Sequence, residues 1–406
     1  MPTTSSRALR EAMVAALEDI GAIRSDAVRQ AFLAVPREDF VPDVVARDGL
    51  DSAYRPDVAL VTATDHRGVP ISSSSAPAIM APMLEALELG DGMRVLEVGA
   101  GTGYNAALLK HLVGDRGRVT SVEVDAGFAR RARRALIDAG YRCRVVVGDG
   151  RRGWPDGAPF DRVIATASSD HVPQAWRDQL VDGGLVELPL RLTTTFMPQL
   201  VACFRREGEL LASTALIPGG FMSLRHPDSS APTKAVPTLR ASAGGARRGQ
   251  LSLEGEGLAA LSPRAARRAL SLLLGPSRRL RTMPRAAATG LTTFLALSGH
   301  RSLLRCNVAG RVGIAVVPPT GSSIAASTVT TGRPGRIDAW GDDHAEAILG
   351  RHIQRWERAG RPTLDDLRLV VGYSDPLPGR HWRTLTRRDS TIAMDWATAP
   401  RPSRSR

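Results

Sequence analysis

Residues 93–125 read MRVLEVGAGTGYNAALLKHLVGDRGRVTSVEVD. The apolar run at 93–99 predicts a buried strand, and the stretch at 104–114 predicts a helix that ends at a glycine. A second apolar run, at 118–124, predicts another strand. A strand, a glycine-rich turn, a helix and a strand in this order are typical of a mostly parallel sheet covered by helices on both faces.

Outward from this stretch, the chain continues to alternate between predicted helices and strands. Apolar residues at helical spacing precede it at 7–35 and 78–88. The segments that follow are a predicted helix at 126–140 and predicted strands at 143–149, 160–168, 185–190 and 199–206. This order predicts an α/β fold of the doubly wound, Rossmann-like class, which we assign to residues 1–222.

The composition changes after this first domain. Residues 223–250 are rich in Pro, Ser, Gly and Arg without a hydrophobic period, which predicts a linker. Residues 251–395 predict a second, smaller α+β domain, and residues 396–406 predict a disordered tail. In the second domain we expect helices at 262–275 and 342–360 and strands at 293–299, 311–318, 323–330 and 367–373.

The overall composition excludes several classes of protein. The chain has 406 residues, of which 43% are hydrophobic and 23% charged, as in a globular protein. It contains no run of about 18 apolar residues and no signal-peptide pattern, so we expect a cytoplasmic protein without a membrane partner. The three cysteines are scattered, which argues against a disulfide framework or a zinc site.

The charge balance favours acidic partners. The formal net charge is +13, and two of the 54 basic residues are lysines (Lys110 and Lys234), so 52 are arginines. A positive surface attracts nucleic acids and acidic peptides alike. Aromatic residues make up only 4% of the chain and would supply few stacking platforms for bases, which disfavours nucleic acid.

Three glycines at alternate positions, Gly99, Gly101 and Gly103, connect the first strand of the opening stretch to its helix. Glycine lets the backbone approach a ligand closely and turn tightly into a helix whose N-terminal amides face that ligand. The usual dinucleotide pattern, G-x-G-x-x-G, would place its third glycine at position 104, where this chain has Tyr104. The turn by itself is therefore a weak signal.

Acidic residues mark the ends of three successive predicted strands, and they strengthen that signal. Glu97, Glu123 and Asp149 stand at these ends. A carboxylate at Glu123 can accept hydrogen bonds from both hydroxyls of a ribose, and one at Asp149 can accept from an adenine amino group. Because the carboxyl ends of parallel strands meet at one edge of a sheet, the three acids predict a site for an adenosine-bearing cofactor.

With these features the sequence resembles a class I S-adenosylmethionine-dependent methyltransferase and, more narrowly, the protein-L-isoaspartate O-methyltransferase family. The resemblance covers about residues 8 to 205. It rests on VLEVGAGTGYNAALL and VEVD together with FLAVPREDFVP (32–42), ISSSSAP (71–77), GDGRRGWPDGAPFDRVIATAS (148–168) and QLVDGGLVELPL (179–190). Within these stretches, AVPREDFVP and PFDRVIATAS are specific to this family.

The resemblance implies that S-adenosylmethionine is the cofactor. The three glycines would cradle its methionine part, Glu123 would hold its ribose, and Asp149 would border its adenine. The cofactor-binding residues that the resemblance implies are Glu97, Gly99, Ala100, Gly101, Thr102, Gly103, Tyr104, Glu123, Val124, Gly148, Asp149, Gly150 and Thr166.

The resemblance also implies a serine on the substrate side. In the family this serine precedes a small or polar residue and a proline, 22 positions before the acid that ends the first strand; counting back from Glu97 reaches Ser75. A carboxylate substrate is already an anion at neutral pH, so methyl transfer to it needs positioning and no general base. The candidate catalytic residues are Ser75, followed by Ser74, Ser73 and Ser72.

Two features depart from the repair enzymes of this family. The segment TATDHRGVPISSSSAP (62–77) is rich in serine where those enzymes have a sequence like Q-T-I-S-x-P. The chain also continues for about 180 residues, including the W-x-x-x-G-x-P pattern WERAGRP (356–362). This pattern resembles the C-terminal region of family members from gene clusters for ribosomally made, modified peptides such as lanthipeptides, lasso peptides and graspetides.

This second resemblance implies a specialised reaction on an acidic or macrocyclic precursor peptide. The enzyme would esterify one aspartate side chain of that peptide, and the C-terminal domain would recognise it. The following backbone amide nitrogen would then attack the ester, release methanol and form an aspartimide, which persists or hydrolyses to isoaspartate and aspartate. Ring closure needs no catalytic residue, because an intramolecular nucleophile has a large effective concentration.

Two other interpretations remain open. The first is an ordinary isoaspartyl repair enzyme with an accessory domain. The second is an RNA methyltransferase, suggested by arginine clusters at 130–134 and 278–281, although these lack neighbouring aromatic residues. We expect no metal, because His344 and His352 are widely spaced and no cysteine joins them; an acidic helix start with surface histidines accounts for both.

Overall fold

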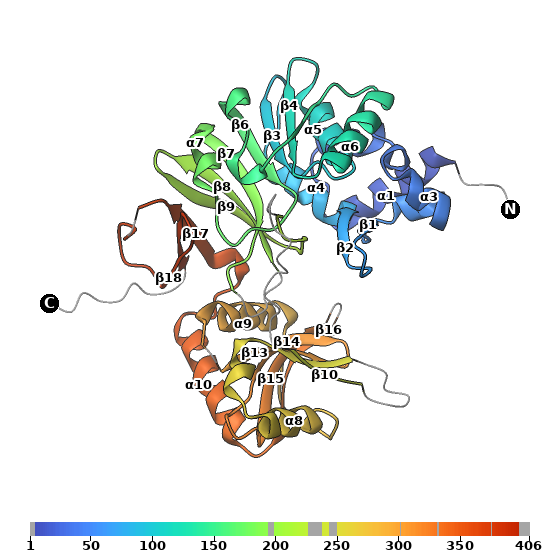
Figure 1. Ribbon diagram of the computed structural model, residues 1–406. Helices are drawn as coiled ribbons and strands as arrows, with labels where there is room; N and C mark the ends of the chain where they lie inside the picture. Colours follow the sequence, from blue (N-terminus) through green and yellow to red (C-terminus); the bar gives the residue numbers. More distant parts are fainter. Residues whose placement is uncertain are drawn as a thin grey trace.

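The computed structural model describes residues 5–193, 199–225, 238–242, 250–300, 302–330, 333–374 and 376–397. In these residues the chain forms a ten-stranded sheet, a seven-stranded sheet and a two-stranded hairpin. The ten-stranded sheet occupies the upper part of the molecule in Figure 1 and the seven-stranded sheet the lower part.

An N-terminal helical region shares a hydrophobic core with the large sheet. Serine side chains start its first two helices, because Ser5 and Ser25 accept hydrogen bonds from backbone N–H groups of the first turn. The elements of this region are α1 (Ser6–Asp19), α2 (Asp26–Ala34), the 3-10 helices η1 (Arg37–Phe40) and η2 (Leu50–Tyr54), α3 (Pro42–Asp48), and the hairpin strands β1 (Leu60–Thr64) and β2 (Pro70–Ser74).

The first half of the large sheet confirms the predicted doubly wound fold. Five parallel strands lie in the order β5-β4-β3-β6-β7, so the strand order reverses between β3 and β6. The elements are α4 (Pro77–Ala86), β3 (Arg94–Val98), α5 (Tyr104–Val113), β4 (Arg118–Glu123), α6 (Ala126–Asp138), β5 (Arg144–Val147), η3 (Gly150–Arg152), η4 (Pro155–Gly157), β6 (Phe160–Ala165), α7 (Gln174–Asp178) and β7 (Leu180–Leu190).

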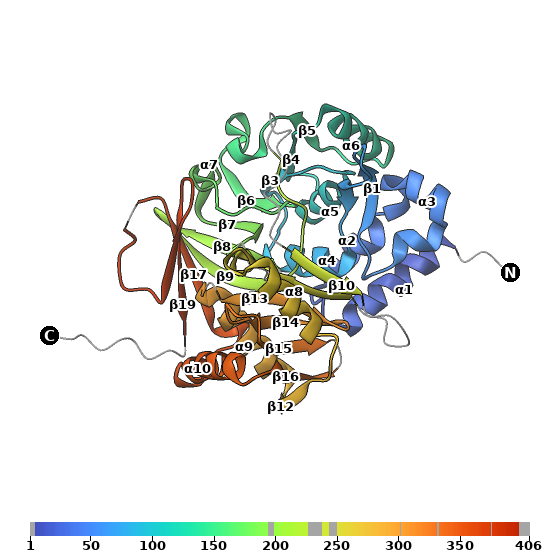
Figure 2. The same ribbon diagram turned by 60° about the horizontal axis from the view of Figure 1, so that its bottom comes forward.

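Antiparallel strands from the middle and from the C-terminal part of the chain complete this sheet. After β8 (Leu200–Glu207) and β9 (Leu210–Pro218) come β17 (Leu367–Gly372), β19 (Thr391–Trp396) and β18 (Arg383–Thr386). Figures 1 and 2 both show β17 beside β9, where Val371 pairs with Leu211. The strand expected at 367–373 therefore belongs to the first sheet and not to a separate domain, because its apolar side chains fill the core beside β9.

The seven-stranded sheet is antiparallel and carries three α-helices, as an α+β region should. Its elements are β10 (Thr238–Ser242), β11 (Gln250–Glu254), η5 (Glu256–Ala260), α8 (Pro263–Leu272), β12 (Arg278–Met283), α9 (Arg285–Ser298), β13 (Leu303–Val308), β14 (Arg311–Val316), β15 (Ser323–Thr330), β16 (Arg333–Gly341), α10 (His344–Arg358) and η6 (Leu364–Asp366).

Two expectations about this second region are wrong. Residues 293–299 were expected to form a strand and instead complete helix α9, because Leu291, Phe294 and Leu295 lie one helical turn apart and are buried together. Residues 238–242 fall within the expected linker and instead form β10, which pairs with β11. Residues 226–237 and 243–249 of that linker, and 398–406 of the expected tail, lie outside the described residues.

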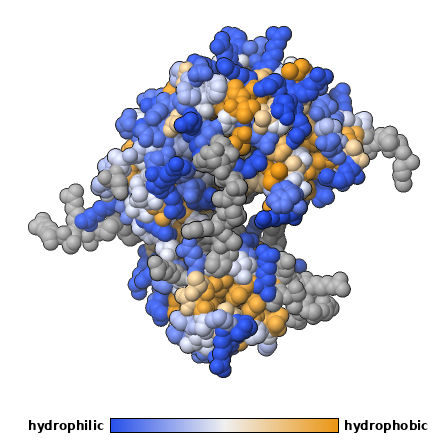
Figure 3. Space-filling view, in the orientation of Figure 1, coloured by the Kyte–Doolittle hydropathy of each residue, from blue (hydrophilic) through white to orange (hydrophobic). Residues whose placement is uncertain are grey.

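An aromatic cluster joins the two sheets. Phe294 of α9 lies 5.3 Å from Trp382 and 5.7 Å from Trp396 between ring centroids, and both tryptophans belong to the β18–β19 hairpin region. Figure 3 shows that the outline of the molecule narrows between the two parts. The second region is therefore fixed to the first through aromatic packing.

The W-x-x-x-G-x-P pattern closes helix α10. Trp356 is buried, and its indole Nε1 donates a hydrogen bond to the carbonyl of Pro362 at 3.0 Å. Gly360 has a φ of 86°, a left-handed conformation that favours glycine just after a helix. Each residue of the pattern thus has a structural role at the helix end.

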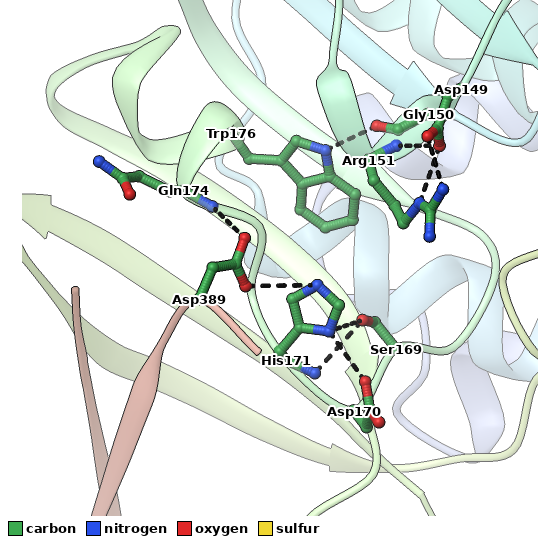
Figure 4. Close-up of polar contacts among 9 residues, drawn as sticks. All are labelled: Asp149, Gly150, Arg151, Ser169, Asp170, His171, Gln174, Trp176 and Asp389. Atoms are coloured by element: carbon green, nitrogen blue, oxygen red, sulfur yellow. Dashed lines mark hydrogen bonds and ion pairs between the residues drawn. The ribbon is translucent and has the colours of Figure 1, made fainter. Parts of the chain in front are cut away.

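A polar cluster connects the loop after β6 to the β18–β19 turn at the other end of the large sheet's chain path, as Figure 4 shows. His171 follows β6, and its ring lies 2.8 Å from Asp170 and 3.4 Å from Asp389, which stands between β18 and β19. The backbone N–H of Gln174 also donates to Asp389. The hydrogen bond between Asp170 and His171 lowers the pKa of Asp170 to about 2.

Within the described residues, no helix combines the length and the apolar character that crossing a membrane requires.

Glu187 on β7 is a buried acid without a partner. Its side chain is fully buried, and in the part of the chain that the structure describes neither carboxyl oxygen has a hydrogen-bond partner. Burial raises the pKa of Glu187 well above its ordinary value of 4.5, so folding holds this carboxyl protonated.

We expect Glu187 to make the protein less stable as pH rises above 4.5. The folded state then binds one proton more than the unfolded chain, which lowers the free energy of unfolding by up to about 1.4 kcal/mol per pH unit. In Glu187→Gln this contribution disappears, and urea unfolding at pH 5 and pH 8 measures the difference. Glu207→Gln, exposed on the neighbouring strand, is the control; equal pH dependence in Glu187→Gln and the wild type would refute the prediction.

Candidate active site

A cavity of about 320 Å³ lies at the carboxyl edge of the large sheet, where the strand order reverses between β3 and β6. In open α/β sheets this is the place where ligands bind. The predicted residues that line it are Ser72, Ser73, Gly99, Gly101, Glu123, Val124, Gly150 and Thr166. Residues far apart in the sequence therefore meet around one cavity, as the acids and glycines predicted.

The glycine turn after β3 brings backbone to this cavity. Gly99, Gly101 and Gly103 all have positive φ, at 101°, 52° and 90°. A Cβ on Gly99 would lie 2.6 Å from Oγ1 of Thr166, whose hydroxyl donates to the carbonyl of Gly99 at 2.7 Å. Side chains other than hydrogen are thus excluded at Gly99, and the backbone stays open to a ligand.

Glu123 ends β4 inside the cavity. It is only 5% exposed, and its carboxylate accepts hydrogen bonds from the backbone N–H groups of Gly101 and Asp125, each at 3.1 Å. A carboxylate has more acceptor sites than these two bonds use, so it can still accept from two ribose hydroxyls. The arrangement suits the role predicted for Glu123.

Glu97 lies outside the lining of the cavity, although the sequence grouped it with the cofactor-binding residues. Its fully buried carboxyl accepts hydrogen bonds from Nδ2 of Asn105 at 2.9 Å and from the hydroxyl of Ser121. Burial raises the pKa of Glu97 to about 7. The side chain connects β3 to α5 and β4, and so supports the glycine turn from behind.

Asp149 is also outside the cavity lining. Its carboxylate forms an ion pair with Arg151 at 2.6 Å, shown in Figure 4, and it accepts the backbone N–H of the same residue. The adjacent Gly150 lines the cavity instead. A Cβ at this position would lie 2.3 Å from a methyl group of Val98, so the close packing there requires glycine. Gly148 does not line the cavity.

A smaller cavity of about 40 Å³ continues from the first. The two share Ser73, Gly99, Gly101 and Thr166 as lining residues. The predicted residues that line only the smaller one are Ser74, Ser75, Ala100, Thr102 and Tyr104. The larger cavity contains Glu123 and the start of the glycine turn, which suit the cofactor, and the smaller one is lined by that turn and by the serine segment.

The four serines divide into two pairs, because side chains alternate along a strand. The hydroxyl of Ser72 accepts a hydrogen bond from Thr62 at 2.9 Å, and that of Ser74 accepts from Arg37. The hydroxyls of Ser73 and Ser75 have no partner in the described chain, and both line the smaller cavity. Ser73 and Ser75 are therefore the serines that can donate to a substrate carboxylate.

Arg37 holds this serine segment and was not singled out by the sequence. It is fully buried, and its guanidinium donates to the carbonyls of Ala53, Ser74 and Ser75 at 2.8 to 3.2 Å. Burial lowers the pKa of Arg37 to about 10. Arg37 belongs to the family-specific stretch AVPREDFVP. The sequence pattern therefore included this residue but did not indicate its role.

Residues 219–225 cross the open side of the cavity and were also missed. Ser168 and this segment exchange backbone hydrogen bonds, with Met222 at 2.7 Å and with Leu224 at 2.8 Å. The guanidinium of Arg225 lies 4.0 Å from Glu123 and 5.4 Å from the ring of Phe128. Residues 223–225, which we expected to begin a linker, therefore form part of the site.

In the described part of the chain, no group of three His, Cys, Asp or Glu side chains is arranged to hold a metal ion. One expectation about the histidines is wrong: His352 is buried rather than on the surface. Its ring packs edge-on against that of His300, with 4.8 Å between centroids.

A doubly wound sheet with this cavity at its switch point defines a class I methyltransferase, an enzyme whose methyl donor is S-adenosylmethionine. The glycine turn and the buried Glu123 fit that cofactor. Residues 8–218 match the model of the family described as Protein-L-isoaspartate(D-aspartate) O-methyltransferase (PCMT). The chain belongs to this family and is an S-adenosylmethionine-dependent carboxyl methyltransferase.

Named relatives support this family assignment. The protein-L-isoaspartate O-methyltransferase of Methanopyrus kandleri is 42% identical over 186 residues, which cover 45% of this chain and 77% of that protein. The enzyme of the same name from Thermotoga maritima is 40% identical over 169 residues, 41% of this chain and 51% of that protein. A solved protein-L-isoaspartate O-methyltransferase matches 90% of this chain and 96% of its own, with 28% identity and a TM-score of 0.51.

The last comparison corrects one argument from the sequence. The length of the C-terminal extension was taken to separate this chain from isoaspartyl repair enzymes. A solved enzyme of that name covers 90% of the chain, so an extension of this length does not make the distinction.

We expect Glu123→Gln to weaken binding of S-adenosylhomocysteine by about tenfold, because a neutral amide accepts weaker hydrogen bonds than a carboxylate. Isothermal titration calorimetry measures this loss. Asp138→Asn, exposed on α6, serves as the matched control and should bind as the wild type does. Unchanged affinity in Glu123→Gln would remove Glu123 from the cofactor site.

We expect Arg37→Lys to lower kcat/KM for methyl transfer at least about tenfold while cofactor affinity changes little. An ammonium cannot serve the same set of carbonyls as a planar guanidinium, so the serine segment moves relative to the cofactor. Steady-state kinetics and calorimetry separate the two effects. Arg29→Lys, in an exposed ion pair with Glu18, is the control; equal losses in kcat/KM and cofactor affinity would point to general unfolding instead.

Proposed function

We propose that the protein methylates the free α-carboxylate of L-isoaspartyl residues in peptides and proteins. The observation that carries the proposal is the pair of unpartnered hydroxyls, Ser73 and Ser75, in a small cavity that opens onto the cofactor cavity. The family match and the two curated relatives, all named for this reaction, support the same substrate. A cytoplasmic location is part of the proposal. The three cysteines, which are free thiols, are consistent with it.

The protein's own groups hold the carboxylate rather than activate it. The cofactor supplies a methyl group on a sulfonium sulfur: the carboxylate oxygen bonds to the methyl carbon as the carbon–sulfur bond breaks. The carboxylate, with a pKa of about 4, is ionised at neutral pH, so no general base is needed. Ser73 and Ser75 donate hydrogen bonds that orient one carboxylate oxygen, and the segment at 219–225 limits the access of water.

A second candidate is the specialised reaction on an aspartate of a ribosomally made, macrocyclic peptide, which leads to an aspartimide. One observation favours it. Ser72 stands where the repair-type segment Q-T-I-S-x-P would place a longer glutamine, so the segment next to Ser73 departs from the repair enzymes at the cavity wall. The W-x-x-x-G-x-P pattern no longer supports this candidate strongly, because its residues close helix α10.

We expect a short linear isoaspartyl peptide to gain one methyl group in the presence of S-adenosylmethionine. Mass spectrometry measures this gain. The aspartyl peptide of the same sequence should stay unmodified. Ser75→Ala should lower kcat/KM by about tenfold, the loss of roughly one hydrogen bond to a charged group. Ser271→Ala, on the exposed face of α8, is the matched control.

The opposite result selects the second candidate. If the cofactor binds but the isoaspartyl peptide is not methylated, the proposal of isoaspartyl repair is wrong. A macrocyclic peptide with one aspartate is then the substrate to test, and the specialised reaction requires methylation followed by loss of methanol.

A further inference from the structure

Two further cavities lie away from the cofactor, one at the junction of the two parts of the molecule and one within the second region. One, of about 270 Å³, is bounded by the end of α9, by β18 and by the residues after β7. Another, of about 190 Å³, lies along α10. Both are lined by His300, so they adjoin. We call their basic lining the basic track; it consists of Arg383, Arg387, His300, His352, Arg351 and Arg355.

The arginines of the basic track lack counter-charges. Arg383 donates to the backbone carbonyl of Leu297 and Arg387 to that of Leu192, and Nε of Arg387 is buried without a partner. Among the described residues, none of the four arginines of the track forms an ion pair, and Glu256 is the acid that lines it. Arg383 and Arg387 are partly buried, which is costly for cations that form no ion pair, whereas Arg351 and Arg355 are exposed on α10. Together they give the track a positive charge that favours an anionic ligand.

The track is physically connected to the active site. The backbone carbonyl of Leu192 accepts a hydrogen bond from Arg387, and Leu192 is preceded in the sequence by Arg191. Arg191 donates in turn to the hydroxyl of Ser223, and Ser223 lines the cofactor cavity. A ligand that occupies the track therefore lies within a short chain of contacts from the reacting carboxylate.

The chemistry of the track suits carboxylates better than nucleic acid. Guanidinium groups bind planar carboxylates with two parallel hydrogen bonds. Apart from the two histidines, no described lining residue is aromatic, so bases would find little to stack on. Burial, aided by the neighbouring His300, Arg355 and Arg351, lowers the pKa of His352 to about 4, as expected in a positive potential.

We propose that the basic track binds acidic side chains of the peptide substrate at positions several residues from the one that is methylated. The inference rests on the proposed function for its substrate class and extends it, since it gives the C-terminal region a role in substrate choice. The preference arises from charge, and rising ionic strength weakens it because salt screens exposed charges over about 8 Å at physiological concentration.

Direct binding tests the track without any reaction. The probe is a rhodamine-labelled heptapeptide of alternating glutamate and glycine, and its glutamine counterpart is the matched peptide. By fluorescence anisotropy, the full chain should bind the glutamate peptide at least about tenfold more tightly, as expected for two charge-assisted hydrogen bonds. The double variant Arg355→Gln/Arg387→Gln should bring the two within about twofold. Arg358→Gln, exposed on α10 outside the track, should behave as the wild type.

Kinetics test whether the track acts on the substrate. Two isoaspartyl peptides are compared, which carry glutamates or glutamines at positions several residues from the isoaspartyl residue. The wild type should show a kcat/KM about tenfold higher for the glutamate peptide, mainly through KM, and the double variant should lose that ratio while methylating the glutamine peptide normally.

The outcomes separate this inference from the proposed function. Equal turnover of both isoaspartyl peptides and equal binding of both heptapeptides would overturn the track and leave isoaspartyl methylation intact. Track-dependent binding without methylation of either isoaspartyl peptide would support the track and reject the isoaspartyl substrate. Tighter, track-dependent binding of a single-stranded RNA of the same charge would overturn the assignment to peptides.

Discussion

The close approach of β3 and β6 at their carboxyl ends is the constraint on which the site depends. Gly99 follows β3 and Thr166 follows β6, and the space between them admits a hydrogen atom but no methyl group. The same closeness recurs where Gly150 meets Val98. Because side chains are excluded at these points, backbone lines this part of the cavity wall, next to the carboxylate of Glu123.

The active site is enclosed by parts that the parallel strands do not supply. The segment at 219–225 crosses the cavity after β9, and β17 pairs with the outer side of that same strand. The serines come from a hairpin at the other end, and a buried arginine from η1 keeps them in place. The walls of the two cavities thus come from segments that are far apart in the sequence.

The C-terminal region is an integral part of this enzyme rather than an attached module. Its last three strands extend the sheet of the methyltransferase half, and its helix α9 packs through Phe294 on tryptophans of the β18–β19 hairpin region. This arrangement creates the junction where the basic track lies. Leu192, Arg191 and Ser223 connect this junction to the cofactor cavity.

The sequence alone determined the doubly wound sheet, the family and most of the cofactor site. These follow from local signals: apolar runs, glycines where φ must be positive, and acids at strand ends that a parallel sheet must gather at one edge. It could not distinguish the side chains of Glu97 and Asp149 from that of Glu123, because all three end strands and only the neighbours decide which one faces the cavity.

The tertiary structure alone decided the remaining features. The helix at 293–299 and the strand at 238–242 were not predicted, because short apolar or polar runs do not specify whether a segment forms a helix or a strand. The roles of Arg37 and of the segment at 219–225 arise from contacts between residues tens of positions apart. The return of β17 to the first sheet depends on β9, about 150 residues earlier, which no local pattern encodes.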